Sequence, residues 1–164
     1  MKKIILIILF SLQAANAGAT QIQGVPFFKQ ERLKCGPSAL ASVMAFYGMQ
    51  VDEARIIKET FTEELKGSLI TDLENYARER GFRTKSGQGD MDTIKENVLA
   101  QKPVIVLLDL GVWQAAKPHY ILVFGFNQNG FIAHDGRRAA TLFKYPRFRK
   151  SWERMGCPFL IIYP

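Results

Sequence analysis

Residues 30–48 read QERLKCGPSALASVMAFYG, and this stretch decides the fold of the chain. Its apolar residues recur at helical spacing, at Leu40, Val43, Met44 and Tyr47. Pro37 suits the first turn of a helix, and Gly48 suits the position just past its end. The stretch therefore predicts a helix over residues 35–47 that begins at Cys35.

The position of Cys35 suggests a reactive thiol. The positive end of the helix and the free N–H groups of its first turn favour a thiolate at this place. The alternative is a buried structural cysteine, since free cysteine behaves mostly as a small hydrophobic residue. Other residues have to decide between these two interpretations.

Three polar residues could assist Cys35 in nucleophilic catalysis. Gln30 lies five positions earlier, where its amide could stabilise the oxyanion of a tetrahedral intermediate, although a plain surface residue fits as well. His119 follows Pro118 and begins an apolar strand; it could act as general base and acid, or serve only as a structural histidine. Asp135, sixteen positions further, could orient the imidazole, or only cap the turn that follows it.

The hairpin that joins these two strands sets a condition on such a triad. If residues 127–130 formed a plain four-residue loop, Asp135 would lie opposite Leu122 and on the other face of the sheet from His119. We therefore predict a β-bulge near residues 127–130.

His134 is a rival base, because the chain has only two histidines. Neighbours along a strand point to opposite faces, so we expect His134 to turn away from whatever Asp135 serves.

The rest of the chain predicts an α+β domain, with helices first and an antiparallel sheet afterwards. Further helices are predicted over residues 52–60, over about 70–80, and after Asp90 or Asp92. The predicted strands are residues 104–108, 119–126, 131–134 and 159–163.

The segments QERLKCGPSALASVMAFYG, PHYILVFGF and FIAHDG, in this order and spacing, resemble the bacteriocin-processing (double-glycine) cysteine peptidase family of the papain clan. The similarity is closest to stand-alone exported members, since VPFFKQ, GSLITDLENYARERGF and WERMGCPFLIIYP also match. The resemblance implies a papain-like cysteine peptidase fold with N-terminal helices packed on a C-terminal antiparallel sheet. It also implies that Cys35 is the nucleophile, His119 the base and Asp135 its orienting residue, with Gln30 and the Cys35 N–H as the oxyanion hole.

The first 17 residues have the pattern of a secretory signal peptide. Lys2 and Lys3 precede an apolar run, and the small residues of Ala15-Asn16-Ala17 suit a cleavage site. Residues 18–164 would then form one papain-like domain, which is periplasmic or extracellular and has no membrane span. Removing Lys2 and Lys3 from the 22 basic residues leaves 20 against 15 acidic ones, a net charge of +5.

Several features leave other interpretations open. Cys157 could form a disulfide with Cys35 and silence it. Basic residues alternate with Tyr145, Phe148 and Trp152 over residues 137–154, but a solvated basic face is preferred, and no nucleic-acid partner is expected.

Two further residues are candidates for substrate binding. Trp113 could line the substrate groove, or be an ordinary half-buried aromatic residue. Gly67 could edge the cleft, although a helix cap at Ser68 explains the same segment.

The sequence thus predicts an exported cysteine peptidase that hydrolyses a peptide bond, in a peptide or protein substrate, after small residues. We expect no organic cofactor. We also expect no metal, since the two cysteines and two histidines are not spaced as metal ligands usually are. The alternative is a non-catalytic papain-like module that binds a peptide or an exported partner.

Overall fold

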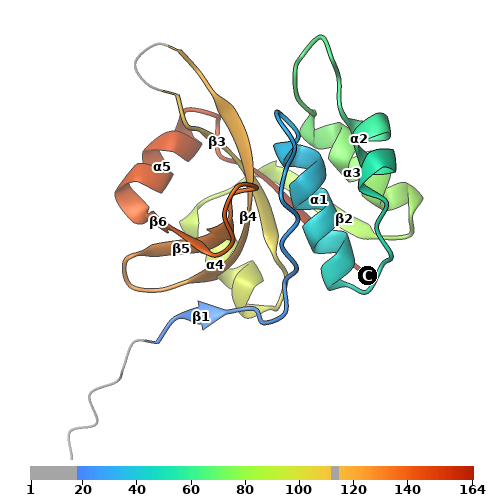
Figure 1. Ribbon diagram of the computed structural model, residues 1–164. Helices are drawn as coiled ribbons and strands as arrows, with labels where there is room; N and C mark the ends of the chain where they lie inside the picture. The colour runs from blue at the N-terminus through green and yellow to red at the C-terminus, as the bar shows by residue number, and fades with distance from the viewer. Residues whose placement is uncertain (1–17, 112–114) are drawn as a thin grey trace, which may run out of the picture.

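The core of the protein is a seven-stranded antiparallel sheet, seen in the computed structural model over residues 18–111 and 115–164 (Figure 1). The strand order is β2-β7-β3-β4-β5-β6, and the short β1 pairs with the far end of β4. The strands are β1 Thr20–Gln21, β2 Arg83–Gln88, β3 Val104–Asp109, β4 Pro118–Phe126, β5 Gly130–His134, β6 Thr141–Lys144 and β7 Pro158–Tyr163. The predicted signal peptide (1–17) and Trp113 lie outside the described residues.

Helices cover both faces of this sheet. The helices are α1 Cys35–Phe46, α2 Glu53–Thr60, α3 Ile70–Glu79, α4 Met91–Leu99 and α5 Tyr145–Glu153. One apolar cluster joins α1, α2 and α3 to residues of β3, β4 and β7, and a second joins α4 and α5 to the opposite face. The predicted α+β class is confirmed. Of the two helices on the face opposite α1, α4 was predicted from the sequence and α5 was not.

Helix α1 begins at Cys35, as the sequence predicts, and ends at Phe46. It is buried from Gly36 through Met44, so it is a central helix of the domain rather than a half-exposed one. Two serines of this helix bind the segment before it: Ser38 Oγ donates to Phe28 O at 2.5 Å, and Ser42 Oγ accepts from Phe28 N at 3.4 Å. These bonds hold the segment that carries Gln30 against α1.

The predicted β-bulge exists, but it lies within β4 and not near residues 127–130. Phe126 pairs directly with Phe131, and the register shifts between Val123 and Gly125 within β4. A Cβ on Gly125 would lie 3.0 Å from Thr20 O, so the close approach of β1 requires glycine beside the shift.

The shifted register has a direct consequence for the site. Leu122 now pairs with His134. Continued by one residue, this register places Asp135 opposite Ile121, and therefore on the same face of the sheet as His119.

The basic segment 137–154 contains β6 and all of α5, neither of which the sequence predicted. Phe148 and Trp152 of α5 are buried in the apolar core. They are therefore not a surface array on which bases could stack. None of the described helices is long and apolar enough to cross a membrane.

Candidate active site

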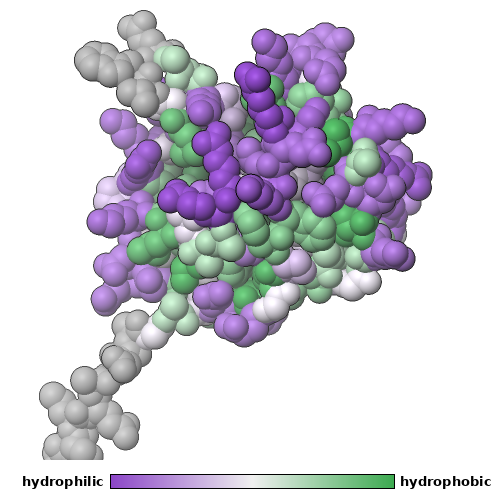
Figure 2. All heavy atoms as spheres, in the orientation of Figure 1, coloured by the Kyte–Doolittle hydropathy of each residue, from purple (hydrophilic) through white to green (hydrophobic). Residues whose placement is uncertain are grey.

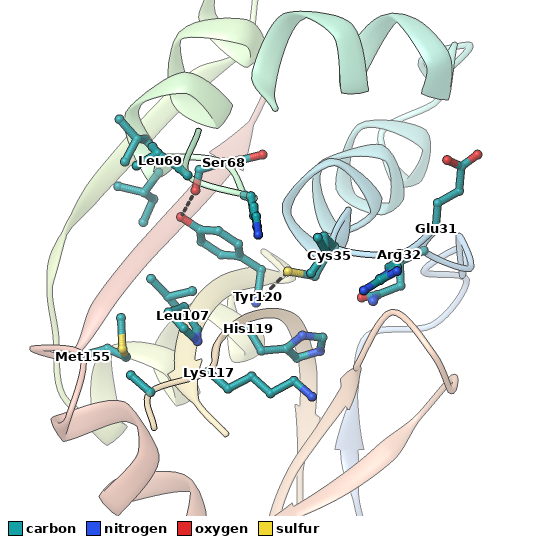
Figure 3. A pocket seen from close by; sticks show the side chains of 18 of the residues that line it. Glu31, Arg32, Cys35, Ser68, Leu69, Leu107, Lys117, His119, Tyr120 and Met155 are labelled. Carbon is teal, nitrogen blue, oxygen red and sulfur yellow. Dashed lines mark hydrogen bonds between the residues drawn. The ribbon is translucent and has the colours of Figure 1, made fainter. Parts of the chain in front are cut away.

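Cys35 opens into a cleft of about 900 Å³ that lies where α1, β4 and the loop before α3 meet (Figure 3). The thiol is half-buried, and its Sγ accepts a hydrogen bond from the backbone N–H of Tyr120 at 3.4 Å. A Cβ on Gly36 would lie 3.1 Å from Ser68 Cβ and 3.2 Å from Tyr120 Cδ2. The wall of the cleft therefore packs closely beside the thiol.

The charge state of Cys35 results from two opposing effects. Burial raises the pKa of the thiol, and this is the larger effect. The N–H groups of Tyr120, Gly36 and Cys35 itself, together with the charge of Arg137, lower the pKa. The helix start thus favours the thiolate as expected, but burial outweighs it, so the pKa of the thiol lies above its ordinary value.

His119 lies at the start of β4, directly before the residue whose N–H contacts Cys35. It is 7% exposed, and its Nε2 lies 2.7 Å from the backbone carbonyl oxygen of Asp135. A carbonyl oxygen only accepts, so Nε2 carries the proton and Nδ1 keeps a free lone pair. Burial lowers the pKa of His119, which keeps the ring neutral and able to act as a base.

The carboxylate of Asp135 does not make the hydrogen bond to His119. Its Oδ1 accepts the backbone N–H of Arg137 at 2.8 Å and that of Arg138 at 2.6 Å, while Oδ2 lies 3.4 Å from Arg138 Nη2. The carboxylate closes the turn after β5, as in the capping interpretation, and the backbone of the same residue holds the imidazole. The negative charge of Asp135 still acts on His119 by raising its pKa against the larger effect of burial.

Gln30 lies against the same turn. Its backbone N–H donates to Gly136 O at 2.7 Å, and its side chain lines the cleft that holds Cys35 and His119. Its Oε1 is buried without a hydrogen-bond partner among the described residues. Gly136 has φ +75°, and a Cβ there would lie 3.0 Å from Gln30 Cδ. The glycine therefore makes room for the Gln30 amide.

The second histidine lies outside the cleft lining. His134 Nδ1 accepts the N–H of Ala140 at 3.2 Å, and its Nε2 lies 3.1 Å from Val25 O. Its ring packs against Phe27 and Phe124. Both nitrogens are engaged with the backbone, so His134 ties the N-terminal segment to β5 and has no lone pair to offer a substrate.

The opposite wall of the cleft contains Gly67, which also pairs with Thr62 in an isolated bridge. The interpretation of Ser68 as a helix cap is wrong: the residue before α3 is Leu69, and α3 has no side-chain cap. Instead Ser68 O accepts from Tyr120 Oη at 3.1 Å. Sequence reasoning missed Tyr120 in this role, because its place beside His119 in an apolar strand looked like ordinary core.

Cys35 and Cys157 are both free thiols, so no disulfide silences the candidate nucleophile. Cys157 borders a separate, smaller pocket with Asp90 and Trp152. Over residues 18–111 and 115–164 no three His, Cys, Asp or Glu side chains gather as a metal site would require.

The fold is that of papain-like peptidase domains in which helices pack on a large antiparallel sheet. The chain belongs to the peptidase C39 family, whose model matches residues 25–157. No curated protein matches it.

Three solved structures share the fold, each with a TM-score of 0.71. One is the peptidase domain of Streptococcus ComA, a bifunctional ABC transporter of a quorum-sensing pathway; it is 24% identical, over 85% of this chain and 98% of that one. A double-glycine motif protease of an AMS/PCAT transporter, in complex with a leader peptide, is 21% identical over 88% of this chain and 94% of that one. A C39-like peptidase from Bacillus anthracis, described as putative, is 15% identical over 90% of this chain and 98% of that one. Membership of this family supports a cysteine peptidase.

Proposed function

We propose that the protein is an exported cysteine peptidase that uses Cys35 as nucleophile and His119 as general base. One observation carries the proposal: Sγ of Cys35 contacts the N–H of Tyr120 at 3.4 Å, so the thiol lies beside the residue that follows His119. Thiol and imidazole line one cleft, and the hydrogen bond at Nε2 leaves Nδ1 free. Family membership supports the same activity.

The proposed reaction begins from a neutral pair. His119 Nδ1 takes the thiol proton, and the sulfur attacks the substrate carbonyl. The N–H of Cys35 and the side-chain amide of Gln30 stabilise the oxyanion, and His119 then donates its proton to the leaving amine. Water hydrolyses the resulting thioester by the same path in reverse. An acyl or peptidyl transferase would share these steps up to the thioester, and product analysis separates the two.

The substrate is proposed to be a peptide or protein that is cut after small residues. Support comes from the double-glycine specificity that the sequence resemblance implies. The solved double-glycine motif protease, bound to a leader peptide, has the same fold.

The test compares the N-termini of exported proteins in cells that carry the wild type, Cys35→Ala or Cys157→Ala. We expect a set of uncut proteins with Cys35→Ala only, because Cys157 borders a separate pocket and does not line the cleft. Equal N-termini in all three strains would contradict the peptidase and favour a binding module.

A non-catalytic peptide-binding module is the second candidate, and the raised pKa of the buried Cys35 thiol favours it. Iodoacetamide separates the two candidates, because His119 should activate the thiol only in an enzyme. In an enzyme, proton removal by His119 should more than offset the raised thiol pKa, so alkylation of Cys35 at neutral pH should be faster than that of a free model thiol and should slow in His119→Ala. Alkylation no faster than the model thiol would favour the module.

Export to the periplasm or the extracellular space is part of the proposal and rests on the pattern of residues 1–17. We expect the mature protein to begin at Gly18. Edman sequencing of the protein recovered from the cell envelope and from the medium tests the cut and the compartment together. An intact N-terminus at Met1 would contradict export.

A further inference from the structure

The cleft around Cys35 has two chemically different ends. Figure 3 shows Ser68, Leu69, Leu107 and Met155 on one side of the thiol, and Arg32 and Glu31 on the other. The first end is largely apolar, with Leu65, Leu69, Ile70, Leu107 and Met155 among its residues. A substrate chain that crosses Cys35 would therefore meet a different environment on each side of the bond that is cut.

The other end is positively charged. The cleft lining contains five exposed cations. Four are Lys29, Arg32, Lys117 and Arg137, and the fifth, Lys66, lies between Leu65 and Gly67 and so belongs to the apolar end. Its described part contains one carboxylate, Glu31. Within the described residues, none of these five cations forms an ion pair. An unpaired group of like charges beside a cleft attracts ligands of opposite charge.

Arg137 is close enough to act on the reacting groups. Burial is the main cause of the shifted pKa values of Cys35 and His119, and the charge of Arg137 lowers the pKa of both. Arg137 follows the Asp135–Gly136 turn, which holds His119 at Nε2 and Gln30 at its backbone N–H. Its guanidinium therefore belongs to the same end of the cleft as the imidazole.

The reaction assigns a direction to the bound chain. His119 gives its proton to the leaving amine, so the departing part of the substrate begins beside the imidazole. It continues past Arg137, while the acyl part extends toward Gly67 and Leu69. Arg32 follows Gln30 by two residues and lies on the charged side of Cys35 in Figure 3.

We propose that the substrate carries acidic residues shortly after the scissile bond, and that Arg32 and Arg137 bind their carboxylates. This inference rests on the proposed peptidase function and gives its substrate a chemical class: a small-residue site followed by an acidic segment. Arginine suits this role because its planar guanidinium can hold a carboxylate with two parallel hydrogen bonds.

The experiment uses the mature protein and a proteome-derived peptide library. Peptides cut by the wild type but not by Cys35→Ala are sequenced, and the residues after the cut are tabulated. The best-cut sequence is then synthesised in two forms that differ only in Asp or Asn after the cut. We expect Asp to be enriched in the library and the Asp peptide to have a higher kcat/KM. Each arginine should account for about a two- to five-fold preference, the range of an exposed ion pair.

Matched variants assign the preference to its residues. In Arg32→Gln/Arg137→Gln the ratio of kcat/KM between Asp and Asn peptides should fall to near one, while Lys150→Gln, an exposed change on α5, keeps the wild-type ratio. The wild-type ratio should also shrink as salt is added, because salt screens exposed charges.

Two results would overturn the inference and leave the peptidase standing: Cys35-dependent cutting without enrichment of acidic residues, or a preference that survives in the double variant. A library with no Cys35-dependent cuts would overturn the peptidase and the inference together.

Discussion

Replacing Gly136 with alanine should separate transition-state stabilisation from thiol reactivity. The glycine has φ +75°, and a Cβ there would lie 3.0 Å from Cδ and 3.1 Å from Cγ of Gln30, with Oε1 closer still. The Gln30 amide must move to admit the methyl group. Alanine at such a φ also costs about 1–2 kcal/mol of stability.

The size of the catalytic effect follows from the proposed role of Gln30. Loss of one donor to an oxyanion typically reduces kcat by about 10²–10³. Even a small displacement of the Gln30 amide takes it out of hydrogen-bonding position and removes much of its contribution to the transition state. We therefore expect kcat/KM of Gly136→Ala to fall by about 10².

Two assays and one control test this prediction. Peptide cleavage needs the oxyanion hole, whereas alkylation of Cys35 by iodoacetamide is a displacement at carbon that forms no oxyanion. We therefore expect alkylation of Gly136→Ala to stay within about two-fold of the wild type. Gly48→Ala is the matched control, because Gly48 has φ +82° with nothing within 4 Å of its added Cβ, so it carries the backbone strain without the clash. Equal cleavage by both variants, or parallel loss of cleavage and alkylation in Gly136→Ala, would refute the role given to Gln30.

Three further predictions follow from the contacts of the site. Because burial lowers the pKa of His119, the acid limb of kcat/KM should lie below pH 6.5, the ordinary histidine value, and a limb at or above it would contradict the buried neutral ring. Burial also lowers the pKa of His134, so below about pH 6.5 the unfolded chain binds protons that the folded chain does not. The free energy of unfolding, measured with urea, should therefore fall from pH 7.5 to pH 5, and should fall less in His134→Gln. An equal fall in the wild type and the variant would show that His134 is not the cause. Finally, Ser38→Ala removes the 2.5 Å bond to Phe28 O and should lower that free energy by about 1–3 kcal/mol, with a loss of kcat/KM as the Gln30 segment loosens; unchanged activity would show that the segment is held by other contacts.

Helix α1 could be predicted because its signals are local. Pro37, the apolar spacing and Gly48 all lie within the helix or next to it, and Gly48 does have positive φ. The place of the bulge in β4 could not be predicted in the same way. It depends on Gly125 meeting Thr20, a contact between residues far apart in the sequence.

Other misses have physical reasons too. Strand β2 is an edge strand with mostly exposed, polar residues, so it lacks the apolar alternation that marks a strand. In α5 the spacing of Phe148 and Trp152 was a helical signal, but the surrounding basic residues led to the interpretation of the segment as a solvated basic face, with no helix predicted. The sequence predicted that Asp135 lies next to His119. It could not predict that the backbone carbonyl of Asp135, rather than its carboxylate, contacts the imidazole, because this depends on the backbone conformation of the turn.

The turn after β5 serves two partners through two consecutive backbone oxygens. Asp135 O holds the imidazole of His119, and Gly136 O holds the backbone of Gln30. These two consecutive carbonyl groups thus fix the spacing between the base and the oxyanion donor. Main-chain atoms supply both contacts, and the Asp135 carboxylate closes the turn that carries them, so this spacing should be sensitive to the loss of that carboxylate and to a change in the length of the turn.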